Sequence, residues 1–101
     1  MRRGTTPTLT FTTEYAAADI AACYVTFEQR GAVVLEKAMG DSGITVSDNL
    51  ITVNLTQEET LAMTTVDTCK AQIRIVLTNG NAVASNIVQF CVCPVLKDGE
   101  I

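Results

Sequence analysis

The stretch "IAACYVTFEQ", residues 20–29, decides the fold class of this chain. Its second half alternates side chains in character, so that Cys23, Val25 and Phe27 share one face. A period of two is typical of a half-buried β-strand, because successive strand residues point to opposite sides of a sheet. We therefore predict a long strand here, with these three side chains facing a core.

Further segments alternate in the same way. Residues 69–78, "CKAQIRIVLT", direct Ile73 and Ile75 to one face and Lys70 and Arg74 to the other. Turn-forming residues separate neighbouring segments, which favours short strands joined by tight connections. The predicted strands are 8–13, 20–29, 32–38, 44–47, 50–55, 69–78 and 82–92.

A short helical turn is predicted among these strands, at residues 56–63. Thr56 and Glu59 have the spacing of a capping box, in which the hydroxyl accepts from a backbone N–H three residues on and the carboxylate reaches back. About seven short strands with turn signals between them favour an immunoglobulin-like β-sandwich over a barrel. The predicted inward-facing residues are Phe11, Val25, Phe27, Val34, Ile51, Val53, Ile73, Ile75 and Leu77.

The length of the chain, 101 residues, fits one domain and leaves no room for a second. We predict a single all-β, immunoglobulin-like domain over residues 1–101. Residues 1–7 are expected to lead into the first strand, and residues 94–101 to form a tail.

The sequence allows two registers for the last hairpin. Asn79-Gly80 is a strong hairpin signal, because both residues tolerate the positive φ of a tight turn. A two-residue loop would place Cys69 beside Phe90, whereas a three-residue loop ending at Asn81 would place Cys69 opposite Cys91. A disulfide between these two cysteines is plausible in the second register alone.

Composition and charge exclude several classes of partner. The net charge is −4 and the seven basic residues are spread along the chain, which argues against a surface that follows phosphates. Arg2 and Arg3 are not followed by the apolar run of roughly 7 to 15 residues that a secretory signal needs, and no stretch reaches the roughly 18 apolar residues of a membrane span. We therefore expect no nucleic-acid or membrane partner, and a soluble protein made in the cytoplasm.

The cysteines are expected to be reduced. Cys23, Cys69, Cys91 and Cys93 would suggest two disulfides in a secreted chain, but the cytoplasm keeps thiols reduced. We predict free and mostly buried thiols that behave as small apolar side chains. The spacing of "CVC" does not suit a zinc ribbon.

No set of residues suggests catalysis. The chain contains no histidine, so nucleophilic catalysis with a histidine base is excluded. Glu58 and Glu59 are adjacent and would diverge by about 100° on a helical turn, which does not suit an acid/base pair. The acidic loops around Asp41 and Asp48 lack the ligand spacing of a calcium loop. We predict that the chain is not an enzyme and has no catalytic, cofactor-binding or metal-binding residues.

Four segments together resemble a known group of proteins. They are "RGTTPTLTFT" at 3–12, "YVTFEQRGAVVLEK" at 24–37, "LTQEETL" at 55–61 and "QIRIVLTNG" at 72–80. They resemble small structural proteins from prophages of Gram-positive bacteria, similar to the N-terminal immunoglobulin-like domain of baseplate upper proteins. The resemblance implies a tail or baseplate structural protein, with Arg2 and Arg3 at the surface near a neighbouring subunit.

The expected function is therefore structural assembly through protein–protein contacts. The threonine-rich "TLTFTT" at 8–13 lacks the lysines that protect an edge strand from pairing with another chain. The expected partners are other phage structural proteins and further copies in a homo-oligomer, with the virion as the final location. The alternative is a module that binds a host surface or carbohydrate, although Tyr15 and Tyr24 are its only tyrosines and such platforms usually need more aromatic side chains.

Overall fold

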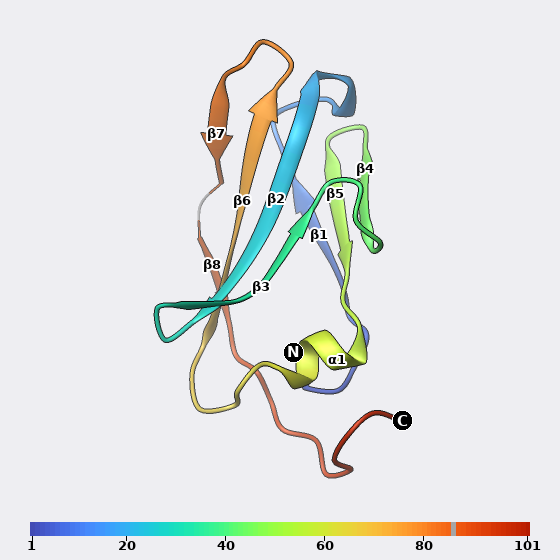
Figure 1. The fold of residues 1–101 in the computed structure, drawn as a ribbon, viewed down its shortest axis with the longest axis vertical. Helices are drawn as coiled ribbons and strands as arrows, with labels where there is room; N and C mark the ends of the chain where they lie inside the picture. Colours follow the sequence, from blue (N-terminus) through green and yellow to red (C-terminus); the bar gives the residue numbers. More distant parts are fainter. Residues whose placement is uncertain (86) are drawn as a thin grey trace.

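The computed structural model describes residues 1–85 and 87–101, and these residues form an almost purely β structure (Figure 1). The predicted all-β class is confirmed, and most strands begin and end within one residue of the predicted bounds. The bounds are β1 Thr8–Thr12, a 3-10 turn Ala17–Asp19, β2 Ile20–Gln29, β3 Ala32–Ala38, β4 Ile44–Ser47, β5 Leu50–Asn54, α1 Gln57–Leu61, β6 Cys69–Leu77, β7 Ala82–Ala84 and β8 Val88–Phe90.

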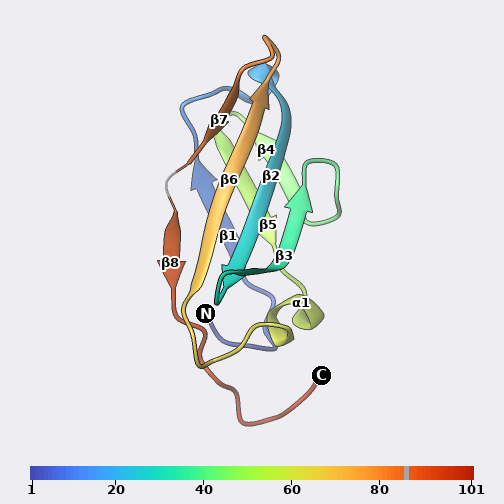
Figure 2. The same cartoon turned by 60° about the vertical axis from the view of Figure 1, so that its left-hand side comes forward.

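The strands form two antiparallel sheets that pack face to face (Figures 1 and 2). The first sheet has the order β1-β5-β4, and the second has the order β3-β2-β6-β7, with β8 also beside β6. A variable-type immunoglobulin domain pairs strands B, E and D in one sheet and C′, C, F and G in the other. Lettering the present strands from B in chain order, with β7 and β8 together as G, reproduces both orders. The predicted immunoglobulin-like β-sandwich is confirmed.

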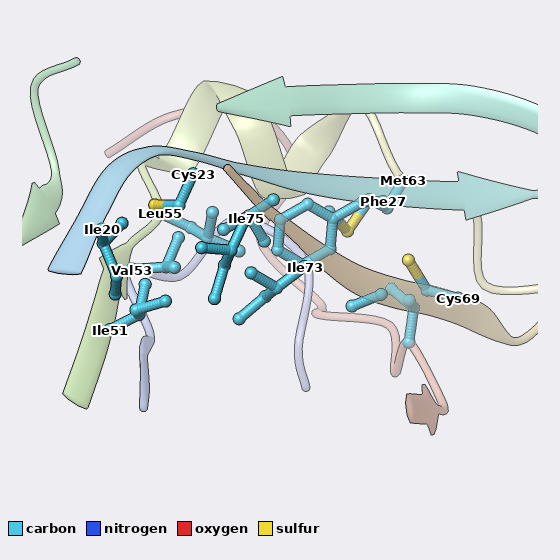
Figure 3. Close-up of a cluster of buried hydrophobic side chains, with 13 residues drawn as sticks. Ile20, Cys23, Phe27, Ile51, Val53, Leu55, Met63, Cys69, Ile73 and Ile75 are labelled. Atoms are coloured by element: carbon cyan, nitrogen blue, oxygen red, sulfur yellow. The ribbon is translucent and has the colours of Figure 1, made fainter. Parts of the chain in front are cut away.

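Alternating side chains of both sheets fill the core (Figure 3). Phe27 of β2 and Ile51 of β5 are fully buried, as the alternation predicts. Three predicted core residues, Phe11, Val34 and Leu77, are only half-buried. Phe11 lies in the edge strand β1 and Leu77 ends β6, whereas in β3 the residue opposite buried Phe27 is Leu35 and Val34 lies at the register shift. Buried residues that the strand pattern did not predict lie at or beyond strand ends. They are Ile20, Leu55, Met63 and Val92.

The α1 helix carries the chain from the first sheet to the second. Its N-cap is the predicted capping box: the Thr56 hydroxyl accepts from Glu59 N at 3.1 Å, and the Glu59 carboxylate accepts from Thr56 N at 2.8 Å. Buried Thr60 donates its hydroxyl to Thr5 O at 2.9 Å, which ties the helix to the start of the chain. The helix is therefore held at both its cap and its buried face.

A buried ammonium group joins β3, β5 and α1. Lys37 is only 6% exposed, and its Nζ lies 3.0 Å from Glu59 Oε1. The same nitrogen donates to Ser42 O at 3.3 Å and Asn54 O at 3.1 Å. A buried charge is tolerated where opposite charge and hydrogen bonds replace water. Gly43 makes room for this cluster, because a Cβ there would lie 2.7 Å from Asn54 O.

A buried amide fixes the connection that follows α1. Gln29, at the end of β2, is 4% exposed. Its side chain donates to Thr64 O at 2.9 Å and to Asp67 O at 3.1 Å, and it accepts from Thr64 N at 2.9 Å. Arg30 forms an ion pair with the Asp67 carboxylate beside it. The amide therefore supplies hydrogen-bond partners for backbone groups of this loop.

The last hairpin follows neither predicted register completely. Leu77 N donates to Asn81 O at 2.8 Å, so the loop has three residues, 78–80, with Gly80 at φ +90°. The predicted strand at 82–92 is two strands, and the register changes by one residue between β7 and β8. Cys69 therefore lies opposite Phe90, as in the first alternative, and not opposite Cys91.

Residues 1–7 precede β1 and contact the other end of the chain. Arg2 forms a parallel β-bridge with Cys93, and Arg3 N donates to Cys93 O at 3.0 Å. Arg2 is exposed as expected, but Arg3 is half-buried and donates to Leu61 O. These residues satisfy backbone groups at the end of the second sheet, which a solvated lead-in would leave to water.

The predicted tail, residues 94–101, is largely exposed but returns to α1. The Gln57 side chain accepts from Ile101 N at 2.8 Å and donates to Ile101 O at 3.1 Å. Figure 1 shows both ends of the chain near this helix.

The cysteines occupy different environments. Cys23 and Cys69 are fully buried, whereas Cys93 is half-buried and Cys91 is exposed. The prediction of mostly buried thiols therefore holds for the two strand cysteines alone. All four have free thiols in the structure, and their reduced state in the cell stays a prediction.

Phe27→Ala tests the central position of the β2 alternation. Phe27 is fully buried and its ring meets that of Phe90 edge to face at 6.4 Å. We expect the substitution to lower the free energy of unfolding by about 3–5 kcal/mol, measured by urea denaturation. The neighbouring outer-face change Thr26→Ala should cost less than about 1 kcal/mol. Equal effects of the two changes would contradict the assigned faces of β2.

Glu59→Gln tests the buried ion pair separately from the helix cap. Glutamine can still accept from Thr56 N, but it leaves the Lys37 ammonium without its counter-charge. Because the Glu59 side chain is 20% exposed, we expect a loss of about 2 kcal/mol, less than for a fully buried pair. Glu58→Gln, on the exposed side of the same turn, is the matched control and should be nearly neutral in thermal unfolding.

Candidate functional site

The free edge of β1 is the first element of the candidate site. Among the strands described, β1 pairs with β5 alone. Leu55 N donates to Pro7 O at 3.0 Å, and Thr13 N donates to Asn49 O at 2.8 Å. The odd-numbered residues of this segment therefore direct their N–H and C=O groups toward β5. Thr10 lies midway between Pro7 and Thr13, so its N–H and C=O groups point away from the sheet.

The side chains of β1 leave this edge accessible. Thr8, Thr10 and Thr12 are exposed, whereas Leu9 and Phe11 are half-buried and point toward the core. No charged residue lies within the strand. Edge strands of natural sheets are usually protected by lysine, proline, a bulge or a covering element. The sequence-based expectation that this strand is an unprotected edge is confirmed.

A groove runs beside that edge, between the two sheets. We call it the seam groove. It consists of two adjoining hollows of about 560 and 500 Å³, which share Thr10, Phe11 and Val88. Ile73 and Ile75 of β6 line its inner part. Figure 2 shows β1 on the same side of the sandwich as β7 and β8. The two sheets therefore leave their common side incompletely covered.

The seam groove has opposite charges at its two ends. Arg2 lines the hollow next to the start of β1, and Glu14 lines the hollow next to its end. Both side chains are exposed, and the other described residues that line the groove have uncharged side chains. The Arg2 guanidinium donates to Pro94 O at 2.8 Å, which holds it at that end. The groove therefore combines apolar side chains such as Phe11 and Ile73 with the hydroxyl groups of threonines along its length, and it has a charged side chain at each end.

Thiol chemistry is not favoured at the buried cysteines. Desolvation by burial raises the pKa of Cys23 and Cys69, and backbone hydrogen bonds from Met39 and Glu28 respectively offset this only in part. A raised pKa keeps these groups as neutral thiols at neutral pH. They therefore serve as small apolar side chains of the core.

Two of the acidic residues considered in the sequence have structural contacts. Glu59 caps α1 and pairs with Lys37, and Asp41 accepts from Ala38 N at 2.8 Å. Residues 1–85 and 87–101 contain no group of three or more His, Cys, Asp or Glu side chains placed to hold a metal ion. No helix in the same ranges is long and apolar enough to cross a membrane.

The two tyrosines do not form a common aromatic surface. Tyr15 lines the seam groove beyond the end of β1. Tyr24 lies on the outer face of β2, 41% exposed and opposite Arg74. A carbohydrate platform usually stacks a sugar on aromatic rings that lie together. Tyr15 and Tyr24 therefore do not form such a platform.

Comparisons with known proteins give one structural match. No protein-family model matches this sequence, and no curated protein matches it. Among solved structures, the V domain of amphioxus IgVJ-C2 is similar, with 9% identity over 94% of this chain and 97% of that chain and a TM-score of 0.39. The immunoglobulin-like assignment rests on the strand order given above.

The sequence predicted the edge but not the groove. The alternation and lack of lysine in residues 8–13 identified β1 as accessible. The position of β7 and β8 beside it depends on which edges of the two sheets coincide, a tertiary property with no local signal. Arg2 is exposed, as the resemblance implies, and it lines one end of the groove, while its contact with a neighbouring subunit stays a prediction.

Hydrogen exchange can test the assigned free edge. The amides of Leu9 and Phe11 face β5, whereas those of Thr10 and Thr12 face the groove side. In the isolated protein, we expect the two threonine amides to exchange at least about ten-fold faster than the other two, measured by NMR. Equal protection of all four amides in a monomer would show that the edge is covered.

Proposed function

We propose that this chain is a non-catalytic structural protein of a phage or prophage, which acts as a tail or baseplate assembly module through protein–protein contacts. The observation that carries the proposal is the unprotected edge of β1 beside the seam groove. Natural domains retain such an edge where another chain is to pair with it, since exposure otherwise promotes unwanted association.

The phage context comes from the resemblance of four segments to prophage structural proteins. Two of these segments contain features with structural roles here. Residues 3–12 contain β1, and residues 55–61 contain the capping box and buried Thr60. Virion components are repeated by symmetry, so contacts with other phage proteins and with further copies of this chain are both part of the proposal.

The proposal predicts that the protein is incorporated into particles. We expect an affinity-tagged chain, tagged at its exposed C-terminal tail, to capture tail or baseplate proteins when expressed with the neighbouring genes. Light scattering on the purified assembly would give the stoichiometry. The tagged chain with Glu58→Gln, a change far from β1 in sequence and on an exposed side chain, is a control that should capture the same proteins.

One result would contradict the proposed phage role. A protein that captures none of these partners and is absent from purified particles by mass spectrometry is not a virion component. Binding to host cell-wall carbohydrate in the same assays would instead favour the alternative of a host-surface module.

A further inference from the structure

We infer that the seam groove binds an extended segment of another protein, which adds to β1 as an antiparallel strand. The segment has apolar side chains at alternate positions, a basic residue near Glu14 and an acidic residue near Arg2. This inference rests on the proposed function, whose partner contact it assigns to one site, and it specifies the chemistry of the contact.

The outer edge of β1 has backbone groups that can pair with a further strand. Thr10 and Thr12 direct N–H and C=O groups away from β5, at the spacing of a strand ladder. An added strand can pair with these groups without any change in the sheet. Both pairings inside the first sheet are antiparallel, and antiparallel pairing is slightly more stable per residue, which sets the direction of the segment.

The interior of the groove offers apolar side chains to the added strand. An added strand directs alternate side chains inward, where Leu9, Phe11, Ile73 and Val88 line the two hollows. Apolar side chains at these alternate positions would remove that surface from water. Polar side chains suit the other positions, which lie beside the exposed threonines of β1.

The charges at the two ends select among such segments. Because the segment runs antiparallel to β1, its amino end lies near Glu14 and its carboxyl end near Arg2. A basic residue at the first position and an acidic residue at the last complement these side chains. Charge complementarity at the rim of an interface contributes mainly to specificity. A segment with its basic and acidic residues exchanged should therefore bind more weakly.

The start of the chain closes part of this side of the sandwich. Residues 1–3 already lie beside the end of the second sheet, through the parallel bridge between Arg2 and Cys93. Among the described residues, no other segment pairs with β1 along this edge. A second folded copy that paired edge-on with β1 would bring its own second sheet toward β7 and β8, whereas a single extended segment has no second layer. The occupant is therefore an extended segment.

The probe is a nine-residue peptide of alternating valine and threonine, with lysine at its amino end, glutamate at its carboxyl end and both termini blocked. The control peptide has the same composition with lysine and glutamate exchanged. Titration of the full chain should show at least ten-fold tighter binding of the first peptide, measured by NMR. The amides of Thr10 and Thr12 should become at least ten-fold more protected from exchange when it binds.

Two variants make the test specific. Thr10→Pro removes an N–H that faces the groove and leaves the bonds of Leu9 and Phe11 to β5, so peptide binding should be lost. If that variant fails to fold by circular dichroism, the charge-exchanged variant decides: Arg2→Glu with Glu14→Lys should prefer the control peptide. No binding at about 1 mM peptide, binding without threonine protection, or an unchanged preference in the exchanged variant overturns the inference.

The same variants separate this inference from the proposed function. If the chain captures phage proteins and the folded Thr10→Pro variant captures them equally well, the assembly role stands and the groove is not its site. If the peptide binds as described but no phage protein is captured, the groove binds a strand and the phage role fails. If neither occurs, both are wrong.

Discussion

The fold depends on a small set of buried polar contacts around α1. Lys37, Glu59, Thr60 and Gln29 bind this helix and the loop after it to strands of both sheets. Each of these groups would be costly to bury alone, and each is satisfied by a partner from a distant segment. The sandwich is therefore joined at one end by directional bonds, while its middle is held by apolar packing.

This arrangement explains why the edge of β1 can stay accessible. With α1 and its polar contacts closing one end of the sandwich, β1 needs only β5 and the core beneath it to stay in place. The domain can then leave an edge strand unprotected without losing its structure.

The sequence predicted those features that depend on residues close together in the chain. Alternation identified every strand of the two central pairings, and Thr56 with Glu59 identified the helix cap. It did not predict the half-burial of Phe11, the internal pairing of residues 1–3 or the groove, because each depends on which distant segments become neighbours. The absence of charge from residues 8–13 did reveal the accessible edge, since protection of an edge is a property of its own side chains.

The change of register between β7 and β8 has a consequence for how the chain tolerates length variation. Val83 faces Ile75, and Phe90 faces Cys69, so inward positions are odd-numbered before the change and even-numbered after it. The hydrophobic pattern changes phase at the same place, which keeps both halves matched to the core. Because one extra residue shifts the register, loss of a single residue between Ala84 and Val88 would make the pairing with β6 continuous and leave Phe90 opposite Cys69. This connection can therefore become one residue shorter while both halves keep their inward faces.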